Sequence, residues 1–315
     1  MKFPVIKAFG ATFAYLAARW LPLAKALWFP VALLVGLQLY TMTPLMTATS
    51  SIIGLGENPD PAEAATLVGE LGKWGLVMIA GSAVAYPMMT VASLLHLVRG
   101  EELKAPIYLR YGGDELRLLA AYILLSGMLL VISIVGGLGA TVVVVIVSLV
   151  LPQARAFLNS LAEIAVNLAT IWFRLRLSVL YPASISTGTI GFGASWEITK
   201  GHAWPLFFFW VLISLAVTPL IVIMSAPFAG EFFPLFQRLS EAGADQAQAR
   251  QAIIPILDAI ARLFSPENPS FALFAAVLFA ATLATTAVFN VAAGISWRFL
   301  TDRDAAPSAA QAMAA

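Results

Sequence analysis

Long stretches without a charged residue constrain this chain more than any other feature of its sequence. The clear ones cover residues 26–56, 74–98, 118–154, 203–230 and 268–297, and a less clean one covers 164–181. About 20 apolar residues in a helix cross the ~30 Å hydrocarbon core of a bilayer. In lipid only helices and closed barrels satisfy their own backbone hydrogen bonds, and these stretches lack the alternating pattern of a barrel. We therefore predict an all-α fold, a polytopic transmembrane helical bundle of about six spans with interfacial amphipathic helices.

The composition excludes several functional classes. Charged residues make up 11% of the chain, against about 25% in an ordinary soluble domain. The net charge is +1, so there is no basic excess that would favour nucleic acid as a partner. The chain has no cysteine, which removes disulfides, thiolate nucleophiles and cysteine-ligated metal centres from consideration.

The predicted organisation is a single integral membrane domain over residues 1–304, followed by a disordered tail over 305–315. The expected spans are residues 24–48, 74–98, 116–137, 158–181, 204–227 and 270–297. Pro182 is expected to end the fourth span. Residues 4–20 are expected to form an interfacial helix before the first span. Apolar residues recur at helical spacing over 231–269, which predicts two amphipathic helices in this loop on the outer side.

The stretch 118–154 is the difficult part of this topology. Its 37 residues would form a helix of about 55 Å, much longer than one crossing needs. Gly136, Gly137 and Gly139 are expected to break the helix. The result would be either one span followed by a Val-rich half-helix or two short spans, and the second option gives seven spans in total.

Basic side chains predict the orientation, because cytoplasmic loops are enriched in Lys and Arg. With six spans, 13 of the 18 basic residues fall on the cytoplasmic side, and with seven spans 12 do. In the six-span topology both termini are cytoplasmic. The first loop on the outer side is acidic, and Asp60, Pro61 and Glu63 have the spacing of an N-cap, an N1 proline and a capping-box acid.

The sequence shows no catalytic constellation, predicts no cofactor, and does not place His96 and His202 as a metal-ligand pair. Glu163, with Asn167 one turn later, is the clear ionisable group within a span. It has two interpretations. Glu163 is either a proton or cation site on a transport pathway, or a carboxylate at the level of the lipid headgroups that pairs with Arg155 or with water.

A second candidate site is basic. Arg174 and Arg176 follow Trp172 at the end of the fourth span, where their side chains can extend to lipid phosphates. The sharper hypothesis is a pocket for an anionic lipid headgroup, formed by Arg110, Arg117, Arg174, Arg176 and Lys200.

The last span carries a stripe of small residues, Ala272, Ala276, Ala280 and Ala284. This spacing permits close contact between helices in lipid. Packing within the chain is the default interpretation, and a contact between copies in a homo-oligomer is the alternative. Residues 231–269 are a second candidate surface for an envelope protein partner.

Two neighbouring segments resemble a known family. Residues 173–186 read FRLRLSVLYPASIS and residues 195–207 read SWEITKGHAWPLF, with motif positions at Ser195, Trp196, Glu197, Thr199, Gly201 and Trp204. They resemble the YciC-like family of bacterial inner-membrane proteins and the membrane domain attached to some glycerophosphodiester phosphodiesterases. The sequence RYGGDELR at 110–117 looks like a cytoplasmic loop of related proteins. The resemblance implies six spans in the bacterial inner membrane, with the motif helix on the cytoplasmic face.

The resemblance implies a membrane topology but does not imply the phosphodiesterase activity. We therefore expect a non-enzymatic inner-membrane protein that interacts with membrane lipids, mainly anionic ones, or serves as a scaffold of the bacterial envelope. The alternative is a transporter or permease for small solutes or lipids, with a pathway near Glu163 and Asn167.

Overall fold

The computed structural model describes residues 3–55, 59–101, 108–151, 153, 155–242 and 246–301. These residues are mainly helical and contain no strand, which confirms the all-α fold class. Six stretches are long and apolar enough to cross a membrane. They are α1 (Val5–Gly54), α2 (Pro61–Arg99), α3 (Gly113–Val150), α4 (Arg155–Arg176) with the short α5 (Leu180–Thr187), α7 (Ala203–Ser225) with α8 (Ala229–Ala242), and α10 (Phe271–Thr301). The tail predicted to be disordered lies outside the described residues.

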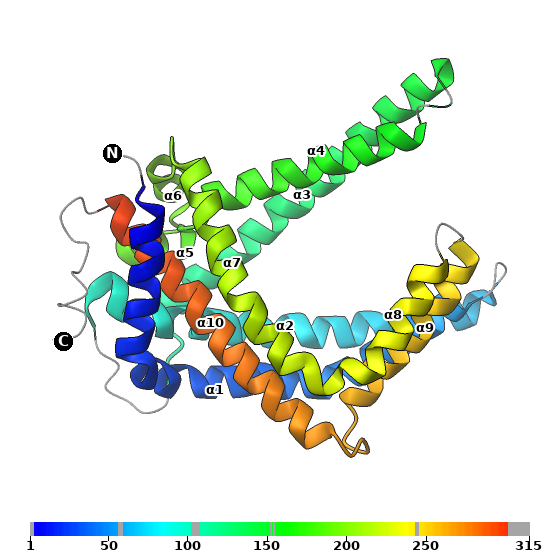
Figure 1. The fold of residues 1–315 in the computed structure, drawn as a ribbon, viewed down its shortest axis with the longest axis horizontal. Coiled ribbons are helices and arrows are strands. Elements are labelled where there is room, and N and C mark those ends of the chain that lie inside the picture. Colours follow the sequence, from blue (N-terminus) through cyan, green and yellow to red (C-terminus); the bar gives the residue numbers. More distant parts are fainter. Residues whose placement is uncertain are drawn as a thin grey trace.

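The helix α1 consists of two helices joined at Arg19, whose φ of −120° and ψ of 16° are not helical. The first part crosses the ends of the other helices, whereas the second part runs along α2 (Figure 1). The first part matches the separate helix predicted for residues 4–20. Just before it, the Phe3 ring lies 5.6 Å from the ring of Phe209 in α7 and 6.3 Å from that of Phe299 in α10.

These contacts gather the N-terminal helix, the start of α7 and the end of α10 at one end of the molecule. We call it the basic end, because it also carries Arg99, Arg110, Arg117, Arg174, Arg176, Lys200 and Arg298. The opposite end is called the distal end.

The main hydrophobic core comes mostly from α1, α2, α7 and α10, which form the body of the molecule, and it also includes Leu118 of α3 and Ile185 of α5. Leu27, Leu34 and Phe209 are among the side chains that this core buries. The helix α10 approaches α2 at Gly294, where a Cβ atom would lie 2.9 Å from side-chain atoms of both Leu94 and Leu97. Since apolar surface gains little by leaving lipid, close packing of this kind holds membrane helices together.

The helices α3 and α4 form an antiparallel hairpin that points away from the body, and we call it the arm (Figure 1). The arm joins the body near the basic end, where the ring of Tyr122 stacks on that of Tyr86 in α2 with centroids 5.8 Å apart. Farther along α3, large apolar side chains such as Val131, Val135 and Leu138 are exposed. In a bilayer this surface meets lipid or another membrane protein.

The helix α3 is unbroken, so the break predicted at Gly136, Gly137 and Gly139 is wrong. Its 38 residues extend about 57 Å at ~1.5 Å per residue. A glycine within a helix costs only about 1 kcal/mol relative to alanine. Gly136 also allows close packing in the arm, since a Cβ atom there would lie 3.2 Å from Val166 of α4.

The distal end carries α8 and α9 (Gln246–Leu263), which are the two amphipathic helices predicted for residues 231–269. The helix α9 packs along α1. The hydroxyl of Ser50 donates to the Asp258 carboxylate at 2.8 Å, and the hydroxyl of Thr43 donates to the Ala261 carbonyl at 3.1 Å. This loop is therefore a packed cover of the distal end of α1.

Among the local predictions, the cap of α2 is confirmed, because the Asp60 carboxylate accepts a hydrogen bond of 3.0 Å from the Ala62 amide. The prediction for Pro182 is wrong, since α4 ends at Arg176 and Pro182 lies in the first turn of α5. The alanine stripe was expected to pack within the chain, and this prediction is wrong for three of its four residues. Ala272, Ala276 and Ala280 are exposed, and Ala284 is half-buried.

Candidate functional site

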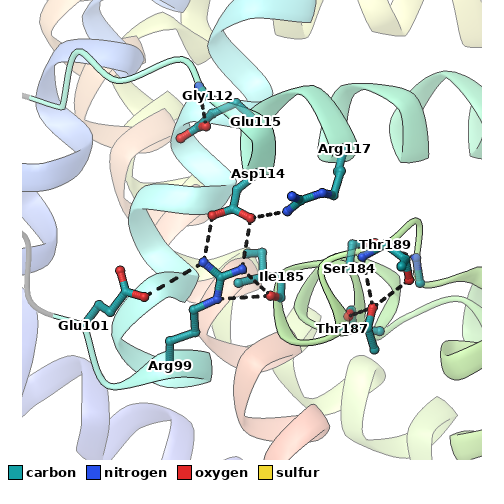
Figure 2. Close-up of polar contacts among 12 residues, drawn as sticks. Arg99, Glu101, Gly112, Asp114, Glu115, Arg117, Ser184, Ile185, Thr187 and Thr189 are labelled. Atoms are coloured by element: carbon teal, nitrogen blue, oxygen red, sulfur yellow. Dashed lines mark hydrogen bonds and ion pairs between the residues drawn. The ribbon is translucent and has the colours of Figure 1, made fainter.

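Asp114 is the centre of a polar cluster at the basic end (Figure 2). It lies in the first turn of α3, and its side chain is only 6% exposed. Arg99, the last residue of α2, donates two hydrogen bonds to the carboxylate at 2.8 and 3.0 Å, and Arg117 donates a third at 2.5 Å. Bidentate bonds between guanidinium and carboxylate are among the strongest hydrogen bonds in proteins. Two partly exposed cations thus share one buried anion.

Arg99 also connects this cluster to α5. Its Nε and one terminal nitrogen donate to the Ile185 carbonyl at 3.2 and 2.6 Å, and the Glu101 carboxylate lies 3.9 Å from the other terminal nitrogen (Figure 2). A single guanidinium therefore joins the end of α2, the start of α3 and the end of α5. The arm is held to the body at this point.

Glu115 forms the second part of the cluster and is fully buried. It accepts a hydrogen bond of 2.7 Å from the Gly112 amide, which caps the start of α3, and another from the Tyr108 hydroxyl. Burial, followed by the hydrogen bond to the Glu115 carboxylate, raises the pKa of Tyr108 well above its ordinary value. The phenol therefore stays protonated and remains a donor to Glu115.

Arg176 anchors the motif helix α6 (Phe192–Ile198) to the end of α4. Its guanidinium lies 4.6 Å from the centre of the Trp196 ring and donates to the Trp196 carbonyl at 2.6 Å. Its own carbonyl accepts hydrogen bonds from the hydroxyls of Ser195 at 3.1 Å and Thr199 at 2.8 Å. These bonds satisfy a carbonyl that the end of α4 leaves without a partner in its own helix.

The five residues predicted to bind an anionic headgroup do not form one pocket. Arg110, Arg174 and Lys200 are exposed at the basic end, and Arg117 is partly exposed but paired with Asp114. Arg176 is only 6% exposed. Its packing against Trp196 makes it part of the fold, so only the exposed members remain available to a ligand.

The other motif residues surround this anchor. Glu197 is exposed, and Trp204, at the start of α7, has 73% of its surface exposed, as suits a side chain at a membrane interface. Gly201 has a φ of +78°, a conformation that a side chain disfavours, and this glycine turns the chain from α6 into α7.

Glu163 and Asn167 line a groove of about 340 Å³ in the arm. Its walls come from α3 and α4 alone, through residues such as Gly137, Thr141 and Asn159. Both Glu163 and Asn167 are exposed. The side chain of Arg155, the predicted partner of Glu163, lies outside the described part of the structure.

Within the described residues, no three His, Asp or Glu side chains lie close enough together to hold a metal ion. His96 instead bonds the Tyr15 hydroxyl at 2.8 Å. Sequence reasoning missed the importance of Arg99, Asp114 and Glu115. Their signal was the pair of acids directly after Gly112 and Gly113, which is typical of a helix start.

Three comparisons with known proteins found no match to this chain. No family model matches it, no curated protein matches it, and no solved structure matches it.

Proposed function

We propose that this protein is a non-enzymatic polytopic protein of the bacterial inner membrane that interacts with lipids as a scaffold of the envelope. The observation that carries the proposal is the contrast between a basic end that exposes Arg110, Arg174 and Lys200 and an arm with uncovered apolar surface. The first suits contact with anionic headgroups, and the second suits contact with acyl chains. The resemblance of residues 173–186 and 195–207 to the YciC-like family supports the same proposal.

The basic end is proposed to face the cytoplasm, with both termini on that side. The chain has no native cysteine, so single cysteines can report the orientation directly. We expect Glu241→Cys in α8 to react with a membrane-impermeant maleimide added to spheroplasts. Lys200→Cys should react only after the membrane is permeabilised, and the reverse pattern would contradict the proposed orientation.

Anionic lipids are proposed to bind Arg110, Arg174 and Lys200. The test is to replace all three with Gln and to measure co-purifying phosphatidylglycerol and cardiolipin. Each basic residue near an anionic surface contributes about 1 kcal/mol, so we expect a loss of about tenfold or more. The matched control replaces the three arginines of the distal helices, Arg238, Arg250 and Arg262, and should retain the lipid. Unchanged lipid in the first variant would refute this role.

Arg176→Gln separates lipid binding from folding. We expect this variant to accumulate poorly because the anchor of α6 is lost, while the lipid bound per folded molecule is unchanged. A selective loss of lipid at normal accumulation would assign Arg176 to the lipid site instead.

The second candidate function is a transporter, and the groove beside Glu163 is the feature that bears on it. Its walls come from two helices only, whereas a pathway through a membrane must be accessible from both sides. We expect Asn167→Cys to react with impermeant reagents from the distal side alone. Reaction from both sides would favour transport.

A further inference from the structure

One side of the arm is polar, and we call it the polar face. Asn159, Glu163 and Asn167 recur at intervals of four residues along α4, so their side chains lie one above the other. Together with Thr141 of α3 they line the groove described above. All three α4 side chains are exposed, and the arm points away from the body (Figure 1). The rest of the chain therefore leaves the polar face uncovered.

The opposite side of the arm is apolar. Leu161, Ala165 and Ala169 each follow one of the three polar residues by two positions, which is about 200° around a helix. They line a second groove, of about 410 Å³, and every other residue that lines it is also aliphatic or glycine. Hydrocarbon suits this second face. The two faces of one hairpin therefore require different surroundings.

The amides of the polar face differ from its hydroxyl. The Thr141 hydroxyl donates to the Gly137 carbonyl of its own helix at 2.8 Å. Among the described residues, by contrast, no hydrogen bond includes the side chain of Asn159 or Asn167. Acyl chains offer neither donors nor acceptors, so an amide in lipid is stabilised by a partner on another helix.

Helix lengths place part of the polar face within the hydrocarbon. Counted along α4, Asn167 lies seven residues from Arg174, which is about 10 Å. Counted along α3, Gly136 lies 18 residues from Leu118, which is about 27 Å, and a Cβ atom at Gly136 would contact Val166, next to Asn167. The hydrocarbon core is about 30 Å thick. Asn167 therefore lies within it whether Arg174 or Leu118 marks the boundary.

We propose that the polar face is the contact between the arms of two copies of this chain. Two copies with the same orientation in a membrane are related by a twofold axis along the membrane normal, so the same residues meet at the same depth. A carboxamide has both donors and an acceptor, and it therefore pairs with a copy of itself. Gly137, Ala140 and Ala162 line the groove beside the amides and allow a second helix to approach closely.

Glu163 lies between the two asparagines on the polar face. In the proposed dimer its carboxylate accepts hydrogen bonds from the amides of the facing arm, and bonds to a charged acceptor are stronger than bonds between neutral groups. The apolar face then remains in contact with lipid. This interface is separate from the basic end and does not depend on the lipid contacts proposed there.

Single cysteines test the interface in native membranes, because the chain has no native cysteine. A disulfide requires Cα atoms about 4.4–6.8 Å apart. We expect Glu163→Cys to form a covalent dimer on oxidation, since Glu163 faces its own copy across the axis. Leu161→Cys is the matched control, at nearly the same depth but on the apolar face, and it should stay monomeric. Equal cross-linking of the two variants, or cross-linking of Leu161→Cys alone, would overturn the proposal.

The monomer–dimer equilibrium in lipid vesicles tests the amides, with energy transfer between labelled copies as the readout. Replacing both Asn159 and Asn167 with Leu should raise the dissociation constant about tenfold, as for the loss of interhelical hydrogen bonds in lipid. Glu163→Gln keeps an acceptor and adds donors, so the dimer should persist. Ala165→Leu fills the groove of the apolar face and should leave the dissociation constant unchanged.

A dissociation constant that the double replacement leaves unchanged would overturn the pairing of amides. A native chain that stays monomeric at every ratio of protein to lipid would overturn the second copy as the partner, as would cross-linking of Glu163→Cys only to a different protein. Circular dichroism should show unchanged helix content in the double variant, since both asparagines are exposed. A retained dimer that has lost anionic lipid would count against the proposed function and not against this interface.

Discussion

The molecule contains two helical hairpins, each with a helix much longer than a bilayer is thick, and their distal ends differ. In the α1–α2 hairpin the distal end is rich in polar residues and is covered by α9, through bonds such as that from Ser50 to Asp258. In the arm the distal end of α3 is rich in valine, and most of these side chains are exposed. Length alone therefore does not decide what surrounds a helix end. Composition indicates that the first hairpin extends into water and the second remains in contact with apolar surroundings.

The junction of the two hairpins should be the most sensitive point. Asp114→Asn leaves Arg99 and Arg117 without their shared anion, and because both are partly exposed we expect a loss of about 2–3 kcal/mol in the free energy of unfolding. The measurement is unfolding in detergent, followed by circular dichroism. Glu101→Gln is the control, since Glu101 is an exposed partner at 3.9 Å and such pairs contribute at most about 1 kcal/mol. Equal effects of the two variants would contradict the role of Asp114.

A lysine placed on each hairpin tests their different surroundings. Val131 lies 13 residues after Leu118, about 20 Å along α3, whereas Thr47 lies 22 residues after Lys25, about 33 Å along α1. We expect Val131→Lys to cost about 2 kcal/mol in membrane integration and Thr47→Lys to cost little. The readout is the fraction of each variant integrated into the membrane. Equal integration of the two would show that the arm, too, extends into water.

Helix packing should distinguish the body from the arm. Gly294→Ala forces a Cβ atom against Leu94 and Leu97, at a cost of about 1–2 kcal/mol. Gly127→Ala on α3 meets no atom within 4 Å, so the better helix propensity of alanine should stabilise the arm by about 0.5–1 kcal/mol. Thermal unfolding of both variants in the same detergent gives the comparison. Destabilisation by Gly127→Ala would mean that α3 is packed against a partner.

Sequence reasoning succeeded where the signal is local. Apolar runs indicate spans directly, and the cap at Asp60 and the amphipathic helices α8 and α9 depend on residues a few positions apart. It failed where contacts between residues far apart in the sequence determine the position of a side chain. Arg176 was predicted to bind lipid, but it bonds Trp196, Ser195 and Thr199 instead. These partners lie 19 to 23 residues away in the sequence.

The unbroken α3 could not be predicted for a similar reason. Three glycines reduce helix propensity, but Gly136 lies against Val166, and the surrounding medium leaves the backbone no partner outside the helix. The cluster around Asp114 likewise depends on a bond between Arg99 and Ile185, 86 residues apart.

The smallest expected effect concerns the cover of the α1–α2 hairpin. Ser50→Ala and Asp258→Asn, alone and together, form a double-mutant cycle on a half-buried hydrogen bond, and we expect a coupling energy of about 1 kcal/mol. Hydrogen exchange in α9 should rise in each single variant, because α9 loses a bond to α1. The matched control is the exposed pair of Gln237 and Glu241 within α8, whose side chains lie 3.1 Å apart, and such pairs contribute about 0.2–0.5 kcal/mol. A coupling as small as the control, with unchanged exchange, would show that apolar packing alone holds α9 on this hairpin. The difference between the covered hairpin and the uncovered arm would then rest on hydrophobic contacts only.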